Sequence, residues 1–151
     1  MGRIASVVEY KVKCATKNQI KEHLLECDDQ FDPRLSERVE LGNFSNKIFV
    51  DAITFEAWHD NSLVGFVSAY MNDEKKHSAY INHVSVLNRF AGQGIASRLI
   101  TNCISHAESS GLREIWLEVS KSNLPAIDLY TKLGFEVIRD DDSAYMMLKR
   151  L

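Results

Sequence analysis

Two glycines one residue apart, Gly92 and Gly94, stand between an apolar run that ends at Val86 and an amphipathic helical pattern that begins at Ile95. Glycine adopts positive φ angles easily and lets a ligand come close to the backbone. The first turn of a helix carries unpaired N–H groups and a partial positive charge. Together these features predict an anion site in the stretch 84–97, and the usual anion at such a site is phosphate.

Three kinds of site use glycines at the start of a helix. A P-loop needs lysine and then serine or threonine after its last glycine, and Ile95 and Ala96 stand there instead. A dinucleotide fingerprint needs a third glycine where Ser97 stands, and five residues separate the strand from the first glycine. Glu118, on the next predicted strand, stands where a ribose-binding acid would, so dinucleotide binding stays a weaker alternative. A turn without any ligand is the remaining interpretation.

The clearest helix of the chain follows the two glycines. Apolar residues recur at three- and four-residue spacing over 95–107, and Gly111 is typical of the position after a helix end. Near the start of the chain, Thr16 and Gln19 form a capping-box pattern, which predicts a second helix there.

Two further helices are predicted, over 35–52 and over 126–133. Asp32-Pro33 is typical of a cap followed by the first helical position, and Gly42 predicts a break within the first of these helices. Gly134 ends the second helix in the same way as Gly111 ends the central one.

Alternating or β-branched segments predict strands over 9–13, 57–58, 63–69, 78–86, 115–119, 135–138 and 144–148. The polar turn Asp60-Asn61-Ser62 joins two of them into a hairpin. A strand–helix–strand unit around 80–119 requires a local parallel pair, whereas hairpins imply antiparallel neighbours. We therefore predict an α/β fold with a mixed sheet and helices on its faces.

The composition bounds the function. The 151 residues fit one domain, 1–151, and the net charge of −3 argues against a nucleic-acid partner because no basic stripe exists. No apolar run is long enough to span a bilayer and no signal peptide is recognised, so we expect a cytoplasmic protein. Met1–Ser6 fits a myristoylation pattern, which short segments match by chance. Three widely spaced cysteines suggest neither disulfides nor a metal site, and no metal is expected.

A longer pattern joins these observations. Three motifs follow one another along the chain: Arg89-x-x-Gly92-x-Gly94, Leu117-Glu118-Val119 and Asn123-x-x-Ala126-x-x-x-Tyr130-x-x-x-Gly134-Phe135. Residues 80–138 closely resemble the GNAT N-acetyltransferase superfamily, whose glycine motif is Q/R-x-x-G-x-G/A. The resemblance implies a mixed, mostly antiparallel sheet of about seven strands, helices on both faces, and a parallel pair that splays at an acetyl-CoA site.

By this resemblance, acetyl-CoA is the co-substrate and its pyrophosphate is the anion. Backbone N–H groups of the loop would hold the pyrophosphate, and those at the end of the preceding strand would contact the pantetheine arm and polarise the thioester carbonyl. The residues implied are Val84, Ser85, Val86, Arg89, Phe90, Ala91, Gly92, Gln93, Gly94, Ile95, Ala96 and Ser97.

The second motif of the helix region implies an acid and a cofactor contact. Tyr130 matches the position of the general acid that protonates the departing CoA thiolate. Its alternative is a packing role, because it lies on the apolar stripe of its helix. Asn123 matches a residue that contacts the cofactor, and its alternative is an ordinary N-cap.

The attacking amine must lose a proton, so a base or a water relay is expected. Glu118 is the first candidate, because relatives that acetylate protein N-termini place a glutamate base in the same Leu-Glu-Val context. His83 is the second candidate, although strand alternation puts it opposite Val84 and favours a core or surface position. Glu56 is a distant third.

These residues together predict an acetyl-CoA-dependent N-acyltransferase that acts on a primary amine. The acceptor is not identified by the sequence, and an amino sugar or a protein N-terminus fits equally. A non-catalytic sensor that binds acyl-CoA on the same fold is the alternative, which an intact Tyr130 disfavours. Edge strands of this fold often pair, so a homodimer is a further expectation.

Overall fold

The centre of the chain is a seven-stranded sheet in the order β1-β2-β3-β4-β5-β7-β6. The computed structural model describes residues 7–73 and 75–151. The strands are β1 Glu9–Val12, β2 Ile53–His59, β3 Ser62–Asp73, β4 Ser78–Val86, β5 Glu114–Ser120, β6 Glu136–Asp140 and β7 Ala144–Arg150. The helices are α1 Lys17–Cys27, α2 Leu35–Arg38, α3 Leu41–Asp51, α4 Ile95–Ser109 and α5 Leu124–Lys132, with short 3-10 helices η1 Asp28–Gln30 and η2 Asn88–Phe90.

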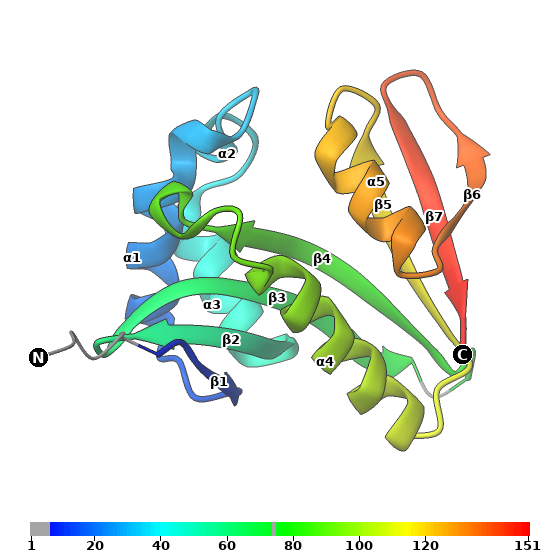
Figure 1. Cartoon of the computed structure of the whole chain (residues 1–151), viewed down its shortest axis with the longest axis horizontal. Helices are drawn as coiled ribbons and strands as arrows, with labels where there is room; N and C mark the ends of the chain where they lie inside the picture. The colour runs from blue at the N-terminus through cyan, green and yellow to red at the C-terminus, as the bar shows by residue number, and fades with distance from the viewer. Residues whose placement is uncertain (1–6, 74) are drawn as a thin grey trace, which may run out of the picture.

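Helices cover both faces of the sheet. In Figure 1, α4 crosses in front of the strands, while α1 and α3 lie behind them. Phe55 of β2 packs on His106 of α4, and Phe66 of β3 packs on His23 of α1, with ring centroids 5.5 Å and 5.2 Å apart. Because each face has its own helical layer, β2 and most of β3 are buried, as the mixed α/β prediction requires.

One pair of strands is parallel, and it separates along its length. β4 pairs with β5 only from Ser78–Glu114 to Ile81–Leu117, whereas every other neighbouring pair of strands is antiparallel. Beyond this point the two strands diverge (Figure 1). The mixed, mostly antiparallel sheet with a splayed parallel pair is therefore confirmed.

Several predicted local features are also confirmed. The hairpin between β2 and β3 turns at Asp60 and Asn61, whose φ angles of 49° and 64° are those of a tight two-residue hairpin turn. The capping box of Thr16 and Gln19 starts α1. Helix α4 buries its apolar stripe, and Gly111 follows it with a φ of 79°.

The single helix predicted over 35–52 is wrong. Two helices, α2 and α3, stand there, and the break lies at Val39 and Glu40 rather than at Gly42, which is inside α3. Val39 is extended, with φ −140° and ψ 154°. The Glu40 carboxylate accepts the N–H of Asn43 and so caps a new helix. A glutamate is a rare cap, so this break was not anticipated.

Asp32-Pro33 does not start a helix as predicted. Helix α2 begins at Leu35 after Arg34. The cap is supplied from a distance, because the Asp28 carboxylate accepts hydrogen bonds from the N–H and the hydroxyl of Ser36. The myristoylation pattern at residues 1–6 lies outside the described residues.

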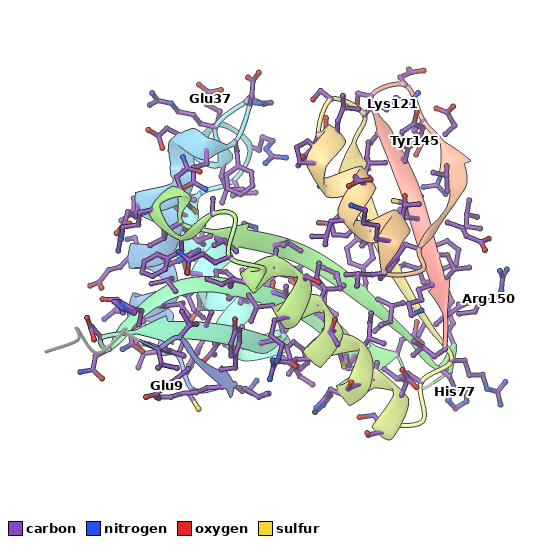
Figure 2. All side chains as sticks on the ribbon, in the orientation of Figure 1. Glu9, Glu37, His77, Lys121, Tyr145 and Arg150 are labelled. Carbon is purple, nitrogen blue, oxygen red and sulfur yellow. The ribbon has the colours of Figure 1, made fainter. Side chains whose placement is uncertain are left out.

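The C-terminal hairpin of β6 and β7 forms one edge of the sheet, where β7 pairs with β5. Figure 2 shows Tyr145 of β7 close to Lys121, which follows β5, and the Lys121 ammonium lies 5.2 Å from the centroid of the Tyr145 ring. Every residue of edge strand β6 is exposed. Pairing of this edge with a second copy of the chain stays a prediction.

A buried carboxylate joins β1 and α1 to the sheet. Glu56 of β2 is fully buried, and its oxygens accept the N–H groups of Cys14 and Ala15 at 3.0–3.1 Å, the Thr54 hydroxyl, and the indole N–H of Trp58 at 3.0 Å. Several donors therefore converge on one acceptor group. This arrangement accounts for a charged side chain in the core.

We predict that Glu56→Gln lowers the free energy of unfolding by about 2–3 kcal/mol, because the new amide NH₂ faces donors and leaves them unpaired. Chemical denaturation measures the change. Glu136→Gln, at an exposed position of β6, is the control and should leave stability unchanged. Equal stability of the two variants would show that the cluster around Glu56 contributes little.

Candidate active site

The divergence of β4 from β5 leaves one edge of β4 without a neighbouring strand. The N–H of Leu87 donates to Val64 on β3, with 2.9 Å between nitrogen and oxygen. Because successive residues of a strand direct their N–H groups to opposite sides, those of Val84 and Val86 are directed toward the side of β5. At this level β5 pairs only with β7. Two backbone donors are thus available along the gap that opens between β4 and β5 beyond Ile81 and Leu117, which we call the splay.

The loop after β4 continues this row of donors. Gly92 and Gly94 have φ angles of 77° and 76°, and a Cβ placed on either would meet no atom within 4 Å. Gly94 directly precedes α4 and no side chain caps the helix. The first bond to the helix backbone runs from the N–H of Arg98 to the carbonyl of Gly94. The open space and the N–H groups of 95–97 fit the predicted anion cradle.

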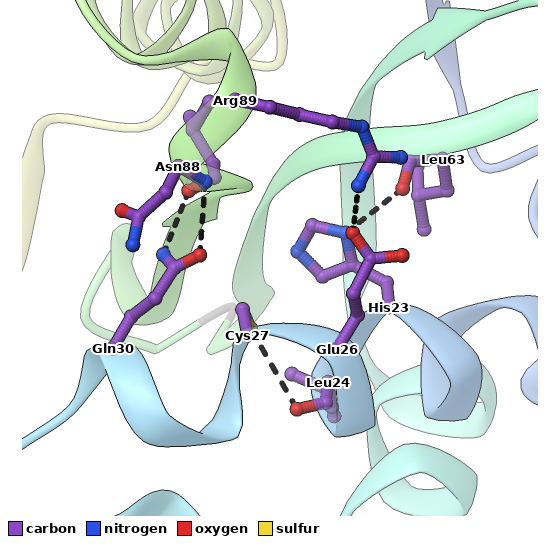
Figure 3. Close-up of polar contacts among 9 residues, drawn as sticks. His23, Leu24, Glu26, Cys27, Gln30, Leu63, Asn88 and Arg89 are labelled. Atoms are coloured by element: carbon purple, nitrogen blue, oxygen red, sulfur yellow. Dashed lines mark hydrogen bonds and ion pairs between the residues drawn. The ribbon is translucent and has the colours of Figure 1, made fainter.

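The side chain of Arg89 is directed away from this cradle. Its guanidinium forms an ion pair with Glu26 on α1 (Figure 3). Gln30 of η1 forms a second tie: its amide donates to the carbonyl of Val86 and accepts the N–H of Asn88, both at 2.9 Å. These contacts fix the end of β4 and the start of the loop against the α1 layer.

Tyr130 lies on α5 and Asn123 directly precedes this helix, which is on the β5 side of the splay (Figure 1). Tyr130 is 7% exposed and its ring packs 6.0 Å from that of Phe135. Burial raises the pKa of Tyr130 to about 12, so its phenol keeps its proton at neutral pH. Asn123 accepts the N–H of Ala126 at 3.3 Å, which confirms the N-cap interpretation. A cofactor contact of Asn123 stays a prediction.

Glu118 is exposed on β5 directly after the last residue that pairs with β4. In the sheet it stands opposite Met146 of β7. Burial raises the pKa of Tyr80 on β4, and the negative charge of Glu118 raises it further. Glu118 therefore lies at the base of the splay and within electrostatic reach of β4.

His83 and Glu56 are poorly placed to act as bases. His83 is buried against Phe31, Phe44 and Phe66, and this burial, followed by the nearby His23, lowers its pKa to about 3. An imidazole with so low a pKa is a weak base near neutral pH. The Glu56 carboxylate is enclosed by its hydrogen-bond donors.

A buried polar chain lies behind the open edge of β4. The Ser85 hydroxyl is 2.8 Å from Nε2 of both His83 and His23, and Nδ1 of His23 is 2.9 Å from the carbonyl of Leu63. Since the carbonyl accepts, His23 carries its proton on Nδ1, Ser85 donates to His23, and His83 donates to Ser85. Burial lowers the pKa of both imidazoles, so both are neutral.

The end of β4 and the glycine loop therefore lie on one side of the splay, and Tyr130 and Glu118 lie on the other. His83 is buried in the core. Sequence reasoning missed Gln30, Glu26 and the serine–histidine chain. Gln30 and Val86 are 56 positions apart, and His23 and Ser85 are 62 apart. No local pattern reports contacts over such separations.

The model of the acetyltransferase (GNAT) family matches residues 17–135, most of the chain. The chain belongs to the GNAT acetyltransferase family. This assignment agrees with its splayed sheet, in which β4 and β5 are the only parallel neighbours among the described strands. It also agrees with the glycine loop that precedes α4.

Individual GNAT proteins are similar to this chain in sequence or fold. N-alpha-acetyltransferase MAK3 of Arabidopsis thaliana is 33% identical over 106 residues, which are 69% of this chain and 56% of that protein. An N-alpha-acetyltransferase of Saccharolobus solfataricus is 31% identical over 114 residues, which are 64% of this chain and 68% of that protein. The chain thus spans about half to two thirds of the length of these relatives.

A solved GNAT structure supports the fold assignment. The PaiA N-acetyltransferase of Thermoplasma acidophilum, crystallised in complex with coenzyme A, has a TM-score of 0.73 at 14% identity, over 95% of this chain and 99% of that one. In the part of this GNAT chain that the structure describes, no group of His, Cys, Asp and Glu could hold a metal ion, and no helix is long and apolar enough to cross a membrane.

We predict that Gly94→Val abolishes binding of CoA while the protein stays folded. A branched side chain disfavours a φ of 76° and fills the space above the helix start. Isothermal titration calorimetry with CoA measures the affinity, and circular dichroism checks the fold. Gly111→Val, at a similar φ of 79° far along the chain from the loop, controls for backbone strain. Unchanged affinity in Gly94→Val would remove the loop from the site.

We also predict that stability falls as the pH drops from about 6.5 toward 3. The unfolded chain protonates His23 and His83 below their ordinary pKa of about 6.5, whereas burial lowers the pKa of both imidazoles in the folded chain, that of His83 to about 3. Acid therefore favours unfolding. Urea denaturation from pH 7 to pH 5 measures how steeply the free energy of unfolding depends on pH. His83→Gln should lower the number of protons taken up on unfolding by about one. The same slope in wild type and variant would contradict the buried neutral imidazole.

Proposed function

We propose that this protein transfers the acetyl group of acetyl-CoA to a primary amine. The observation that carries the proposal is the open edge of β4, whose free donors lead directly into the glycine loop at the start of α4. A long ligand with an amide-bearing arm and a phosphate group fits such a row, because backbone donors can bind both parts. Acetyl-CoA is such a ligand, and a GNAT protein of the same fold was crystallised with coenzyme A.

The β4 edge also supports the chemistry. When an amine attacks the thioester, negative charge develops on the carbonyl oxygen, and a fixed N–H group stabilises that charge. The N–H of Val84 is directed into the splay beyond the last paired residue, Ile81. Gln30 and the Ser85–histidine chain hold this strand end, so the donor needs little reorganisation during the reaction.

Tyr130 is proposed as the acid that protonates the departing CoA thiolate. Its raised pKa keeps the proton available at neutral pH. The water-poor surroundings that raise this pKa also raise the proton affinity of a thiolate formed beside it, so proton transfer remains favourable. In a protein that only senses acyl-CoA, a buried phenol at this position would have no such use.

Glu118 is proposed as the base, directly or through water. It is exposed, it lies where β4 and β5 separate, and its charge reaches Tyr80 across the two strands. An incoming ammonium would be attracted to this carboxylate and lose its proton there. His83 is too deeply buried for this role.

The acceptor is proposed to be the α-amine of a protein or peptide. Both sequence relatives described above are named N-alpha-acetyltransferases. An amino sugar is the competing acceptor class. Both classes present a primary amine that needs the same base, acid and carbonyl donor, so the proposed mechanism holds for either.

A transfer assay tests this function. The protein is mixed with acetyl-CoA and either short peptides with free N-termini or amino sugars, and thiol release is followed with a chromogenic reagent. We expect release that depends on the amine, with peptides ahead of amino sugars. Tight CoA binding without release for any amine would favour the acyl-CoA sensor. Thermal stabilisation by NAD and not by CoA would overturn the ligand assignment.

Tyr130→Phe should lower kcat by about a hundredfold, while the Kd for acetyl-CoA stays almost unchanged, because only the proton donor is lost and the ring still packs on Phe135. Steady-state kinetics and calorimetry on the same preparation measure the two constants. Phe135→Leu removes an aromatic neighbour without touching the hydroxyl and is the matched control. Turnover at the wild-type rate would make Tyr130 a packing residue.

Glu118→Gln should depress kcat/KM most at low pH, where the amine is mainly protonated, and should converge with wild type at high pH. A pH–rate profile with the best acceptor measures this. Glu136→Gln, on the exposed edge strand, is the control. A parallel offset at every pH would mean that Glu118 positions groups, and superimposed profiles would exclude it from catalysis.

A further inference from the structure

A cavity of about 540 Å³ opens on the sheet near the reaction site. Its walls come from strands and from the turn between β3 and β4, and none of its lining residues belongs to a helix. Three aromatic side chains, Tyr70, Tyr80 and Trp116, face it. A cavity of this size holds a small ligand or a bulky side chain.

The cavity begins where the splay begins. Tyr80 and Trp116 are partners across β4 and β5, and the two strands stop pairing one residue later. Glu118 follows Trp116 by two residues and therefore lies on the same face of β5. Met146, the residue opposite Glu118 on β7, is itself part of the cavity wall. Two residues of a strand span about 7 Å, so a group that packs on Trp116 lies about 7 Å from Glu118, the proposed base.

The charges of the described residues that line the cavity balance one another. Asp73 and Glu114 oppose Lys76 and Arg139. Glu114 is also engaged with Trp116, whose indole N–H donates to its carboxylate at 3.0 Å. Since no charge dominates and the broad surfaces are aromatic rings, the walls favour an uncharged apolar group, which buries its surface against them.

We propose that this cavity, given the acetyl transfer proposed above, receives a large apolar group of the acceptor while the acceptor's amine lies at Glu118. The enzyme then selects amines that carry an aromatic or branched apolar group about 7 Å from the nitrogen. Trp116 and Tyr80 are specificity-determining residues, because they form the wall nearest the splay.

The experiment compares two probe amines, 4-phenylbutylamine and butylamine, which share the amine and the alkyl chain and differ by the ring. We expect wild type to show a kcat/KM at least about tenfold higher for 4-phenylbutylamine. Trp116→Ala should bring this ratio close to one, because the ring of 4-phenylbutylamine loses the wall against which it packs. Met146→Trp narrows the cavity and should also lower the ratio. Phe49→Ala, at a partly exposed aromatic residue of α3 outside the cavity, should keep the wild-type ratio.

Binding is measured separately from turnover, by calorimetry of both amines with the CoA-loaded protein. Equal kcat/KM for the two amines in wild type, or an unchanged ratio in both cavity variants, overturns the cavity proposal and leaves acetyl transfer standing. Preferential binding of 4-phenylbutylamine that Trp116→Ala removes, without acetylation of any amine, supports the cavity and overturns the proposed function.

Discussion

The structure depends on one constraint, the early end of the pairing between β4 and β5. A parallel neighbour would otherwise consume the N–H groups on that edge of β4, and no donor would remain for a ligand. Because pairing stops at Ile81 and Leu117, the edge of β4 beyond Ile81 lies within the sheet but has no strand paired with it. The same divergence separates Tyr130 on one side from the glycine loop on the other. Cofactor contact, carbonyl stabilisation and proton transfer can therefore meet in one gap.

An open strand needs support from its other sides. β3 pairs with β4 in an antiparallel ladder, and contacts of Gln30 and Glu26 connect the strand end and its loop to η1 and α1. Behind the strand, Ser85 satisfies two buried imidazoles at once. A fully satisfied polar network of this kind fixes one arrangement of the backbone, since any shift would leave a buried group unpaired.

Sequence patterns predicted the features that local chemistry decides: the hairpin turn, the stripe of α4, the glycine loop and the parallel pair. The break before α3 was missed because Glu40 is an unusual cap, and His83 could be excluded as a base only once Phe31 and Phe44 were seen to cover it. The small positions of the glycine motif also match two residues later, at Gly94 and Ala96, but Ala91 then stands where the motif has glutamine or arginine.

Amide hydrogen exchange observed by NMR tests most directly whether CoA binds along the free edge of β4. We predict that saturating CoA slows exchange of the Val84 and Val86 amides at least about tenfold. The amide of Leu87, already bonded to Val64, should change far less. Confirmed CoA binding that leaves the Val84 and Val86 amides unprotected would show that CoA does not bind along this edge.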